Sequence, residues 1–275
     1  MRPEHPPGRC GVKAAYLSGY RAFLRYVEVP GADPPLLWLH GWQCSSTGEL
    51  MPAAVQLPLR GRRSLLIDLL GHGYSDKPLD FGYGLEDHAR TIVALIDSLG
   101  LGQCGLVGHS MGGAIAILVA AARPAVVSLL VMAEGHVEPD GDEVLDGQTE
   151  DQFAARGFPD QLARQAKEAE AQPDSLGAAH LGITRLVEPR AIHREAVSMA
   201  RETSPTLRSL LAGLEMPRWY LNGELSEPDP EFDRGMTAIG VGLIVVPRTG
   251  HPMGLQNPEG LAQAVAEVIP ASWAG

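Results

Sequence analysis

The pentapeptide Gly108-His109-Ser110-Met111-Gly112 restricts the fold of this chain more than any other stretch. An apolar run at 104–107 precedes it, and a helix-like stretch from 111 to about 122 follows it. G-x-S-x-G between a strand and a helix is typical of a nucleophile elbow, whose glycines let the two elements approach closely. We therefore predict that Ser110 is a nucleophile at a helix N-terminus, where free N–H groups favour negative charge. The alternative is an idle serine in a glycine-rich turn.

Strand-like and helix-like segments alternate through the first half of the chain. Two strand-like runs within 11–30, broken at Ser18-Gly19, predict an antiparallel hairpin. Helical spacing covers 85–99. Continuous apolar runs, typical of strands buried on both faces of a parallel sheet, lie at 36–39, 64–67, 104–107 and 127–132. This order predicts an α/β fold with a mostly parallel, doubly wound sheet and right-handed crossovers.

The alternation breaks after Glu134. No run between 136 and 212 resembles a strand, and helical segments are predicted there at 151–155, 159–171 and 189–201. Strand patterns resume at 217–221 and 243–246, and a last helix is predicted to begin at Asn257-Pro258. Inserted helices suit a cap over the C-terminal edge of the sheet, where such sheets bind ligands. We predict a flexible N-terminal tail at 1–10, a core formed by 11–135 and 213–275, and a helical cap at 136–212.

Charge and cysteine content exclude several classes of protein. A net charge of −11 over 275 residues, without a clustered basic face, argues against a nucleic-acid partner. No apolar run reaches the roughly 20 residues that cross a bilayer, and the first residues lack the apolar segment of a signal peptide. Cys10, Cys44 and Cys104 are an odd and scattered set, which favours a reduced, cytoplasmic protein.

A serine hydroxyl needs a base, and position separates the nine histidines. His251 follows the last apolar strand and so lies at the same sheet edge as Ser110. Its neighbour Pro252 favours an extended backbone that keeps it in a loop. The interpretation of the other histidines is structural: His40, His72 and His109 orient loops, and His88 and His136, with the remainder, are surface or cap residues. No pair has metal-ligand spacing, so neither a metal nor a cofactor is predicted.

Four motifs together resemble the α/β-hydrolase fold family. They are Leu39-His40-Gly41-Trp42, the stretch from Asp68 to Ser75, the pentapeptide around Ser110, and Gly250-His251. They occur in the family's order and cover the chain from about residue 20 to its end. The resemblance implies an eight-stranded sheet with the cap inserted after the sixth strand, and it places the catalytic base on the loop of His251.

The resemblance also supports two donors for an oxyanion hole. The backbone N–H of Met111, one residue after the nucleophile, is the first donor, and the N–H of Trp42 lies where such hydrolases place the second. The alternative for Trp42 is that its side chain merely packs against the cap.

The acid of the triad is the hardest assignment. Family members most often carry an aspartate where this chain has Ser226, and a serine cannot stabilise an imidazolium by charge. Some members, including haloalkane dehalogenases and certain lactonases, take the acid from the end of the strand after the elbow helix, which is the position of Glu134. We predict Glu134 as the acid, with Glu227 or Asp229 as alternatives. Asp68 is excluded, because its stretch resembles the family's structural turn.

These residues predict a serine hydrolase that cleaves a carboxylic ester or lactone through an acyl-enzyme. A serine at the elbow excludes the dehalogenase and epoxide hydrolase chemistries, which the family performs with aspartate there. The aliphatic cap suggests a small or medium apolar substrate, and the sequence leaves a homodimer open. The rivals are a carbon–carbon bond hydrolase of vinylogous diketone acids, a cofactor-free perhydrolase or acyltransferase, and a non-catalytic ligand-binding protein of this fold.

Overall fold

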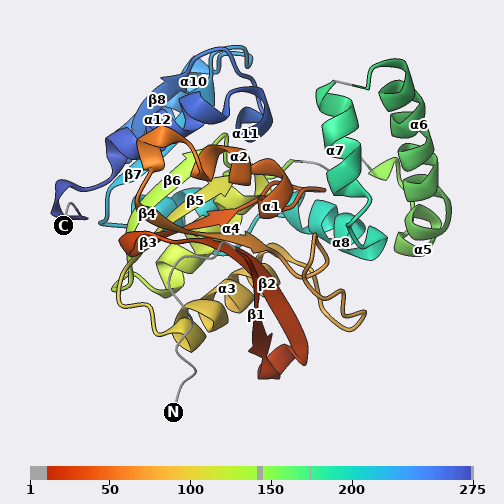
Figure 1. The fold of residues 1–275 in the computed structure, drawn as a ribbon, viewed down its shortest axis with the longest axis horizontal. Coiled ribbons are helices and arrows are strands. Elements are labelled where there is room, and N and C mark those ends of the chain that lie inside the picture. Colours follow the sequence, from red (N-terminus) through yellow and green to blue (C-terminus); the bar gives the residue numbers. More distant parts are fainter. Residues whose placement is uncertain (1–10, 141–144, 174, 274–275) are drawn as a thin grey trace.

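One eight-stranded sheet organises the computed structural model, which describes residues 11–140, 145–173 and 175–273 (Figure 1). Its strand order is β1-β2-β4-β3-β5-β6-β7-β8. The strands are β1 (Gly11–Leu17), β2 (Ala22–Val29), β3 (Ala32–Leu39), β4 (Arg62–Asp68), β5 (Cys104–His109), β6 (Val127–Ala133), β7 (Arg218–Gly223) and β8 (Gly242–Val246). β2 pairs antiparallel with β1 and β4, and every other neighbouring pair is parallel. The predicted hairpin and the mostly parallel sheet are confirmed.

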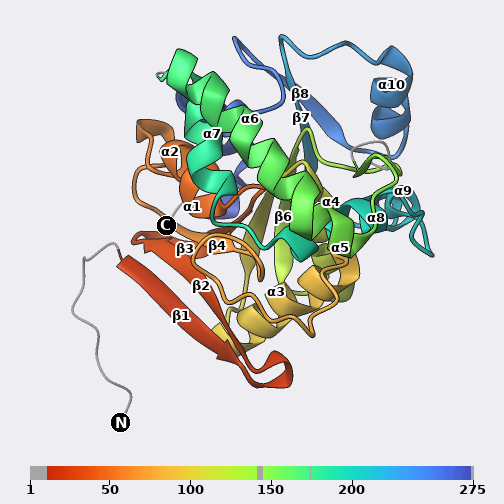
Figure 2. The ribbon, with the colours of Figure 1, turned by 90° about the vertical axis from the view of Figure 1, so that its right-hand side faces the viewer.

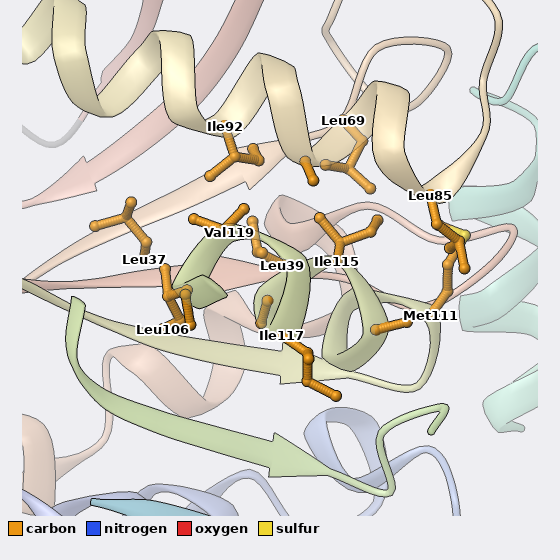
Figure 3. Close-up of a cluster of buried hydrophobic side chains, with 14 of the residues drawn as sticks. Leu37, Leu39, Leu69, Leu85, Ile92, Leu106, Met111, Ile115, Ile117 and Val119 are labelled. Atoms are coloured by element: carbon orange, nitrogen blue, oxygen red, sulfur yellow. The ribbon is translucent and has the colours of Figure 1, made fainter. Parts of the chain in front are cut away.

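Strand β3 shows why both faces of the sheet are covered. Alternate side chains of a strand point to opposite faces. Leu37 and Leu39 join the cluster that includes α3 (Leu85–Leu99) and α4 (Met111–Ala122), and Figure 3 shows them gathered with side chains of these helices. Leu36 and Trp38 join the opposite cluster, which includes α12 (Pro258–Val268). The second half of β3, residues 35–39, is therefore apolar and buried between two helical layers.

Short helices and turns lie between the strands of this body and after its last strand. They are α1 (Ser46–Glu49), α2 (Met51–Ala54), α10 (Pro230–Ala238) and α11 (Met253–Gln256), with 3₁₀ turns at Ser18–Tyr20, Leu57–Leu59 and Ala271–Trp273. The predicted helix over 85–99 has these bounds in the structure. The predicted start of the last helix is also confirmed, because the Asn257 side chain accepts a hydrogen bond from the Gly260 N–H at 2.9 Å.

The residues between β6 and β7 form helices and no strand in the part of the chain that the structure describes. They are α5 (Glu150–Gln152), a π-helical turn (Phe153–Gly157), α6 (Phe158–Ala171), α7 (Leu176–Thr184), α8 (Pro189–Met199) and α9 (Leu207–Ala212). Figure 1 and Figure 2 show α6 and α7 standing outside the sheet, with α8 closer to it. The sequence analysis did not separate α7, because Gly177 and Gly182 weaken its helical signal. We refer to α5–α9 as the inserted helices.

The parallel strands end at one edge of the sheet, and the predicted site residues follow those ends. Ser110 follows β5, Glu134 follows β6, and His251 lies on the loop after β8. Because β3 and β6 flank β5, the loops of Gly41 and Glu134 lie on either side of Ser110. The predicted tail, 1–10, lies outside the described residues. Within the described ranges, no helix combines the length and apolarity needed to cross a membrane.

Candidate active site

The pentapeptide forms a sharp turn between β5 and α4. Ser110 has φ 51° and ψ −120°, a conformation that is strained for any residue with a side chain. Its N–H donates to the Ala133 carbonyl at 3.1 Å, and its carbonyl accepts from the Gly113 N–H at 2.8 Å. A Cβ on Gly108 would collide with the carbonyl of Gly112, so glycine is required where the strand and the helix cross. The chain therefore has the predicted order of strand, turn and helix.

The structure brings His251 and Glu134 together. The Nδ1 of His251 lies 2.9 Å from a carboxylate oxygen of Glu134, and the other oxygen accepts the Gly223 N–H at 2.8 Å. A carboxylate only accepts, so we assign the imidazole proton to Nδ1, which leaves Nε2 unprotonated. The His251 side chain is 55% exposed and that of Glu134 is 13% exposed. Glu134, with φ 42°, is a second non-glycine residue in the left-handed region.

Glu134 is held in its ionised form. Burial acts to raise its pKa, but hydrogen bonds from the His251 ring and the Gly223 N–H, together with the nearby Ser226 hydroxyl, outweigh burial and lower the pKa to about 2. Ser226, at the family's acid position, therefore favours the ionised carboxylate instead of replacing it. This role of Ser226 was not predicted from the sequence.

The alternative acids have other surroundings. Glu227 is exposed. Asp229 caps α10, where its carboxylate accepts the backbone N–H groups of Glu231 and Phe232 at 3.1 and 2.9 Å. Asp68 holds its glycine-rich turn as expected, because its carboxylate accepts the N–H groups of Tyr74 at 3.0 Å and Thr47 at 3.1 Å. Among these carboxylates, Glu134 is the one bonded to His251.

The loop after β3 lies against the elbow. A Cβ on Gly41 would lie 2.8 Å from Nδ1 of His109 and 3.3 Å from Cβ of Ser110. The ring N–H of Trp42 donates to the Ile192 carbonyl of α8 at 3.0 Å, so its side chain packs against the inserted helices. Within the part of the chain that the structure describes, no acceptor is bonded to the backbone N–H of Trp42 or Met111. The predicted oxyanion donors therefore have no competing partner there.

A pocket of about 870 Å³ opens at this edge. Ser110, Glu134 and His251 line it, together with aromatic side chains of the body and with Met199 of α8. The aromatic residues are Trp42, Tyr220 and Phe232. A volume in this range is typical of small-molecule sites. The lining is mixed, because the carboxylates of Glu138 and Asp140 line the pocket together with its apolar side chains. The aromatic share of the lining comes from the body and not from the inserted helices.

Comparison with known proteins identifies the family. Residues 34–181, more than half of the chain, match the family model described as the alpha/beta hydrolase fold. The chain belongs to the α/β-hydrolase fold family.

Relatives within this family perform different reactions. An sn-1-specific diacylglycerol lipase of Mus musculus is 40% identical over 101 residues, which are 37% of this chain and 32% of the lipase. The chain thus spans about a third of that relative. A 2-succinyl-6-hydroxy-2,4-cyclohexadiene-1-carboxylate synthase of Salmonella typhimurium is 28% identical over 255 residues, which cover 88% of this chain and 97% of the synthase. Similarity to these two does not select one reaction.

Solved structures agree on the fold. The enol-lactonase of Burkholderia xenovorans LB400 superposes with a TM-score of 0.77 at 17% sequence identity, covering 93% of this chain and 99% of the lactonase. Such low identity shows the shared architecture alone. The predicted eight-stranded hydrolase sheet, with helices inserted after the sixth strand, is confirmed.

Beneath the elbow of this hydrolase fold lies a second His–Glu pair that the sequence analysis missed. A carboxylate oxygen of Glu49 lies 2.7 Å from Nδ1 of His109, with side-chain exposures of 2% and 5%. Burial acts to raise the Glu49 pKa, but the charge and proton of His109 and the Gly41 N–H outweigh it and lower the pKa to about 2. Burial acts to lower the pKa of His109, and Glu49 reverses this and raises it. The pair is therefore ionised.

A buried cluster of His72, His88 and Glu195 joins the body to the inserted helices, and it shows that one prediction was wrong. His88, predicted to be a surface or cap residue, is fully buried on α3. Its Nε2 lies 2.9 Å from one oxygen of Glu195 on α8, and Nε2 of His72 lies 3.4 Å from the other oxygen. Burial raises the pKa of Glu195 to about 7, although His88 opposes this. His88 lies four and seven positions before Ile92 and Leu95, on the same buried face of the helix. This spacing was the sequence signal that indicated its burial.

His136 is a second correction. Predicted to be a surface or cap residue, it is buried, lines the pocket and lies 3.0 Å from a carboxylate oxygen of Asp140. Cys44 is also buried, and burial raises the pKa of its thiol, so it is a poor nucleophile. Among the described residues, no group of three or more His, Cys, Asp or Glu side chains is arranged to hold a metal ion.

Proposed function

We propose that this protein is a serine hydrolase that cleaves a carboxylic ester or lactone through an acyl-enzyme. The observation that carries the proposal is the 2.9 Å contact between His251 and Glu134, at the sheet edge where Ser110 occupies a strained elbow. A base oriented by an ionised carboxylate beside an elbow serine has the parts of a catalytic triad.

The proton positions support a defined sequence of steps. The Nδ1–H of His251 donates a hydrogen bond to Glu134, so in the neutral imidazole Nε2 is free to accept the proton of Ser110 as the hydroxyl attacks the substrate carbonyl. The tetrahedral intermediate collapses, the C–O bond breaks, and His251 returns the proton to the leaving alcohol. Water then attacks the acyl-enzyme with the same base, releasing the acid and restoring Ser110.

The developing oxyanion requires fixed donors. We assign this role to the backbone N–H groups of Met111 and Trp42, which have no other acceptor among the described residues. Met111 is the first residue of α4, so the dipole of that helix also favours the negative charge. Each such donor is worth roughly 3 to 4 kcal/mol in the transition state.

The pocket favours a small or medium apolar acyl or alcohol group. Trp42, Tyr220 and Phe232 supply apolar surface, and about 870 Å³ accommodates a ligand of that size. The 55% exposure of the His251 side chain leaves the base accessible to water, which suits hydrolysis. Activity confined to highly charged esters would contradict this substrate class.

The test is hydrolysis of p-nitrophenyl esters of graded chain length by the wild type and by Ser110→Ala. The proposal expects wild-type turnover that depends on chain length and falls by several orders of magnitude in Ser110→Ala. Inactivity of the wild type at every length would favour the carbon–carbon hydrolase or acyltransferase alternatives. Failure of the wild type to react with a fluorophosphonate probe would favour the non-catalytic binding protein.

A further inference from the structure

We propose that Glu49 and His109 are positioning residues that hold two loops in place around Ser110. One is the loop of Gly41 and Trp42, called here the oxyanion loop, and the other is the loop of His251. This inference rests on the proposed serine hydrolase function. Neither side chain is assigned a step in the reaction. Together they connect three segments that the reaction needs in fixed relative positions.

His109 fixes the backbone of His251. Nε2 of His109 lies 2.8 Å from the His251 carbonyl, and since a carbonyl only accepts, this nitrogen carries a proton. The same carbonyl accepts the Met253 N–H at 2.8 Å. The two imidazole rings lie 4.7 Å apart between centroids. His109, which directly precedes Ser110, therefore holds His251 in place through a hydrogen bond to the backbone carbonyl of His251.

Glu49 connects the oxyanion loop to His109. One carboxylate oxygen accepts the Gly41 N–H at 3.1 Å, and the other lies 2.7 Å from Nδ1 of His109. This second contact is close but does not meet the angles of a hydrogen bond, so it is best described as an ion pair. Gly41 directly precedes Trp42, whose N–H we assign to the oxyanion hole. One carboxylate thus links the oxyanion loop, the elbow and, through His109, the loop of the base.

The burial of this pair argues against a role in filling space. A buried ion pair costs desolvation that well-packed apolar side chains avoid, and such replacements are often neutral or stabilising. Here both partners are almost wholly buried, and each also makes a specific hydrogen bond to the main chain of a different loop. A pair of apolar residues could fill the volume but could make neither of these two bonds.

Displacement of a catalytic loop by about 1 Å can cost roughly a hundredfold in rate. Loss of either main-chain bond should therefore lower the reactivity of Ser110 and kcat by about tenfold to a hundredfold, with little change in KM. Glutamine preserves the geometry at both positions. At 109 its amide can still donate to the His251 carbonyl, and at 49 its amide oxygen can still accept from the Gly41 N–H. Methionine is similar in length but can do neither.

The experiment compares His109→Gln with His109→Met and Glu49→Gln with Glu49→Met. The readouts are the second-order rate of Ser110 labelling by an alkyl fluorophosphonate, and kcat and KM for p-nitrophenyl butyrate. We expect the methionine variants to be labelled at least tenfold more slowly than the wild type, and the glutamine variants to stay within about threefold. Equal rates within each pair overturn the inference. A wild type that is not labelled at all overturns the proposed function instead, so the two failures are distinguishable.

A measurement on the unmodified chain covers the case in which a methionine variant does not fold. Nitrogen-15 spectra of histidine-labelled protein report which ring nitrogens carry protons. Assigned by comparison with His109→Gln, the His109 Nε2 signal must be that of a protonated nitrogen. An unprotonated Nε2 at this position cannot donate to the His251 carbonyl, and it overturns the inference without any assay of activity.

Discussion

Two fully buried carboxylates of this fold, each beside histidine, have pKa values that are shifted in opposite directions. Glu49, under the catalytic loops, has a pKa lowered to about 2, and Glu195, where α8 meets α3, has a pKa raised to about 7. Burial is the largest influence on both and acts in the same direction. The difference is in the donors: Glu49 accepts a backbone N–H from Gly41 and faces a histidine whose other nitrogen already donates to a carbonyl.

Glu195 has no such support. Within the described residues, no backbone N–H donates to it, and its histidine neighbours, His72 and His88, are themselves shifted toward the neutral form by burial. Fixed donors, and not the depth of burial, therefore decide whether a buried carboxylate stays charged. Glu49 and Glu134, whose pKa values are lowered, lie at the loops around Ser110, whereas Glu195, whose pKa is raised, lies at a packing interface.

The largest effect should come from neutralising the ionised carboxylate that faces the pocket. Glu134→Gln keeps the size of the side chain but removes the charge that orients and stabilises the protonated His251. We expect kcat for p-nitrophenyl esters to fall by about a thousandfold to ten-thousandfold. Glu227→Gln, on the exposed loop nearby, is the matched control and should remain near wild type. Comparable losses in the two variants would show that Glu134 is not the acid.

A smaller effect is expected on the free energy of unfolding, which should distinguish Glu49 from Glu195. At pH 6, Glu49→Gln removes a charge and should lower the free energy of unfolding by roughly 1 to 3 kcal/mol. Glu195, with a pKa of about 7, is mostly a neutral acid at that pH, so its glutamine variant should lose less than about 1 kcal/mol. Urea unfolding at pH 6 measures both. A larger loss in Glu195→Gln would reverse the comparison.

The stabilisation by Glu49 and His109 should have a pH window. The folded pKa of Glu49 lies below its ordinary 4.5, so its contribution is present above pH 4.5 and is lost as the pH falls toward 2. The folded pKa of His109 lies above its ordinary 6.5, so its contribution is present below pH 6.5 and is lost as the pH rises through the raised value. The difference in unfolding free energy between wild type and Glu49→Gln should peak between about pH 4.5 and 6.5. A difference that rises steadily through pH 8 would contradict the ionised pair.

The smallest effect concerns Ser226. Ser226→Ala removes a hydroxyl that favours the ionised form of Glu134 but leaves the hydrogen bonds from His251 and Gly223, so kcat should fall only about threefold to tenfold. Leu225→Ala, at an exposed neighbour on the same loop, is the control. No change in Ser226→Ala would mean that the hydroxyl is dispensable for holding the acid.

Much of this site follows from the sequence because topology constrains it. Ser110, Glu134 and His251 each follow a strand of one parallel sheet, so a correct order of strands brings them to one edge. The choice of Glu134 as the partner of His251 came from the resemblance to family members that take the acid from the strand after the elbow helix. Periodicity, likewise, predicted the helix over 85–99, but the polar character of His88 obscured the fact that it lies on the buried face.

Contacts between side chains of distant segments were beyond the sequence analysis. Glu49 lies on a four-residue helix with no pattern that indicates burial, and its partner His109 is sixty positions away. The influence of the Ser226 hydroxyl on the pKa of Glu134 likewise depends on how two loops converge. Such pairings depend on side-chain geometry, which neither composition nor periodicity encodes.

The inserted helices leave the body just after Glu134 and return at β7, which pairs directly with β6. Chain connectivity thus permits a graft, in which another helical segment replaces this one without interrupting the sheet. The side chains at the junction restrict such a replacement. Glu195 belongs to the replaced segment, whereas its partners His72 and His88 remain in the body. A chimera would need either a new polar partner for these two rings or apolar residues in their places. Replacing the inserted helices is therefore a matter of redesigning this buried cluster, together with the contacts that Trp42 and Gly71 make with the segment, and not only of choosing where to cut.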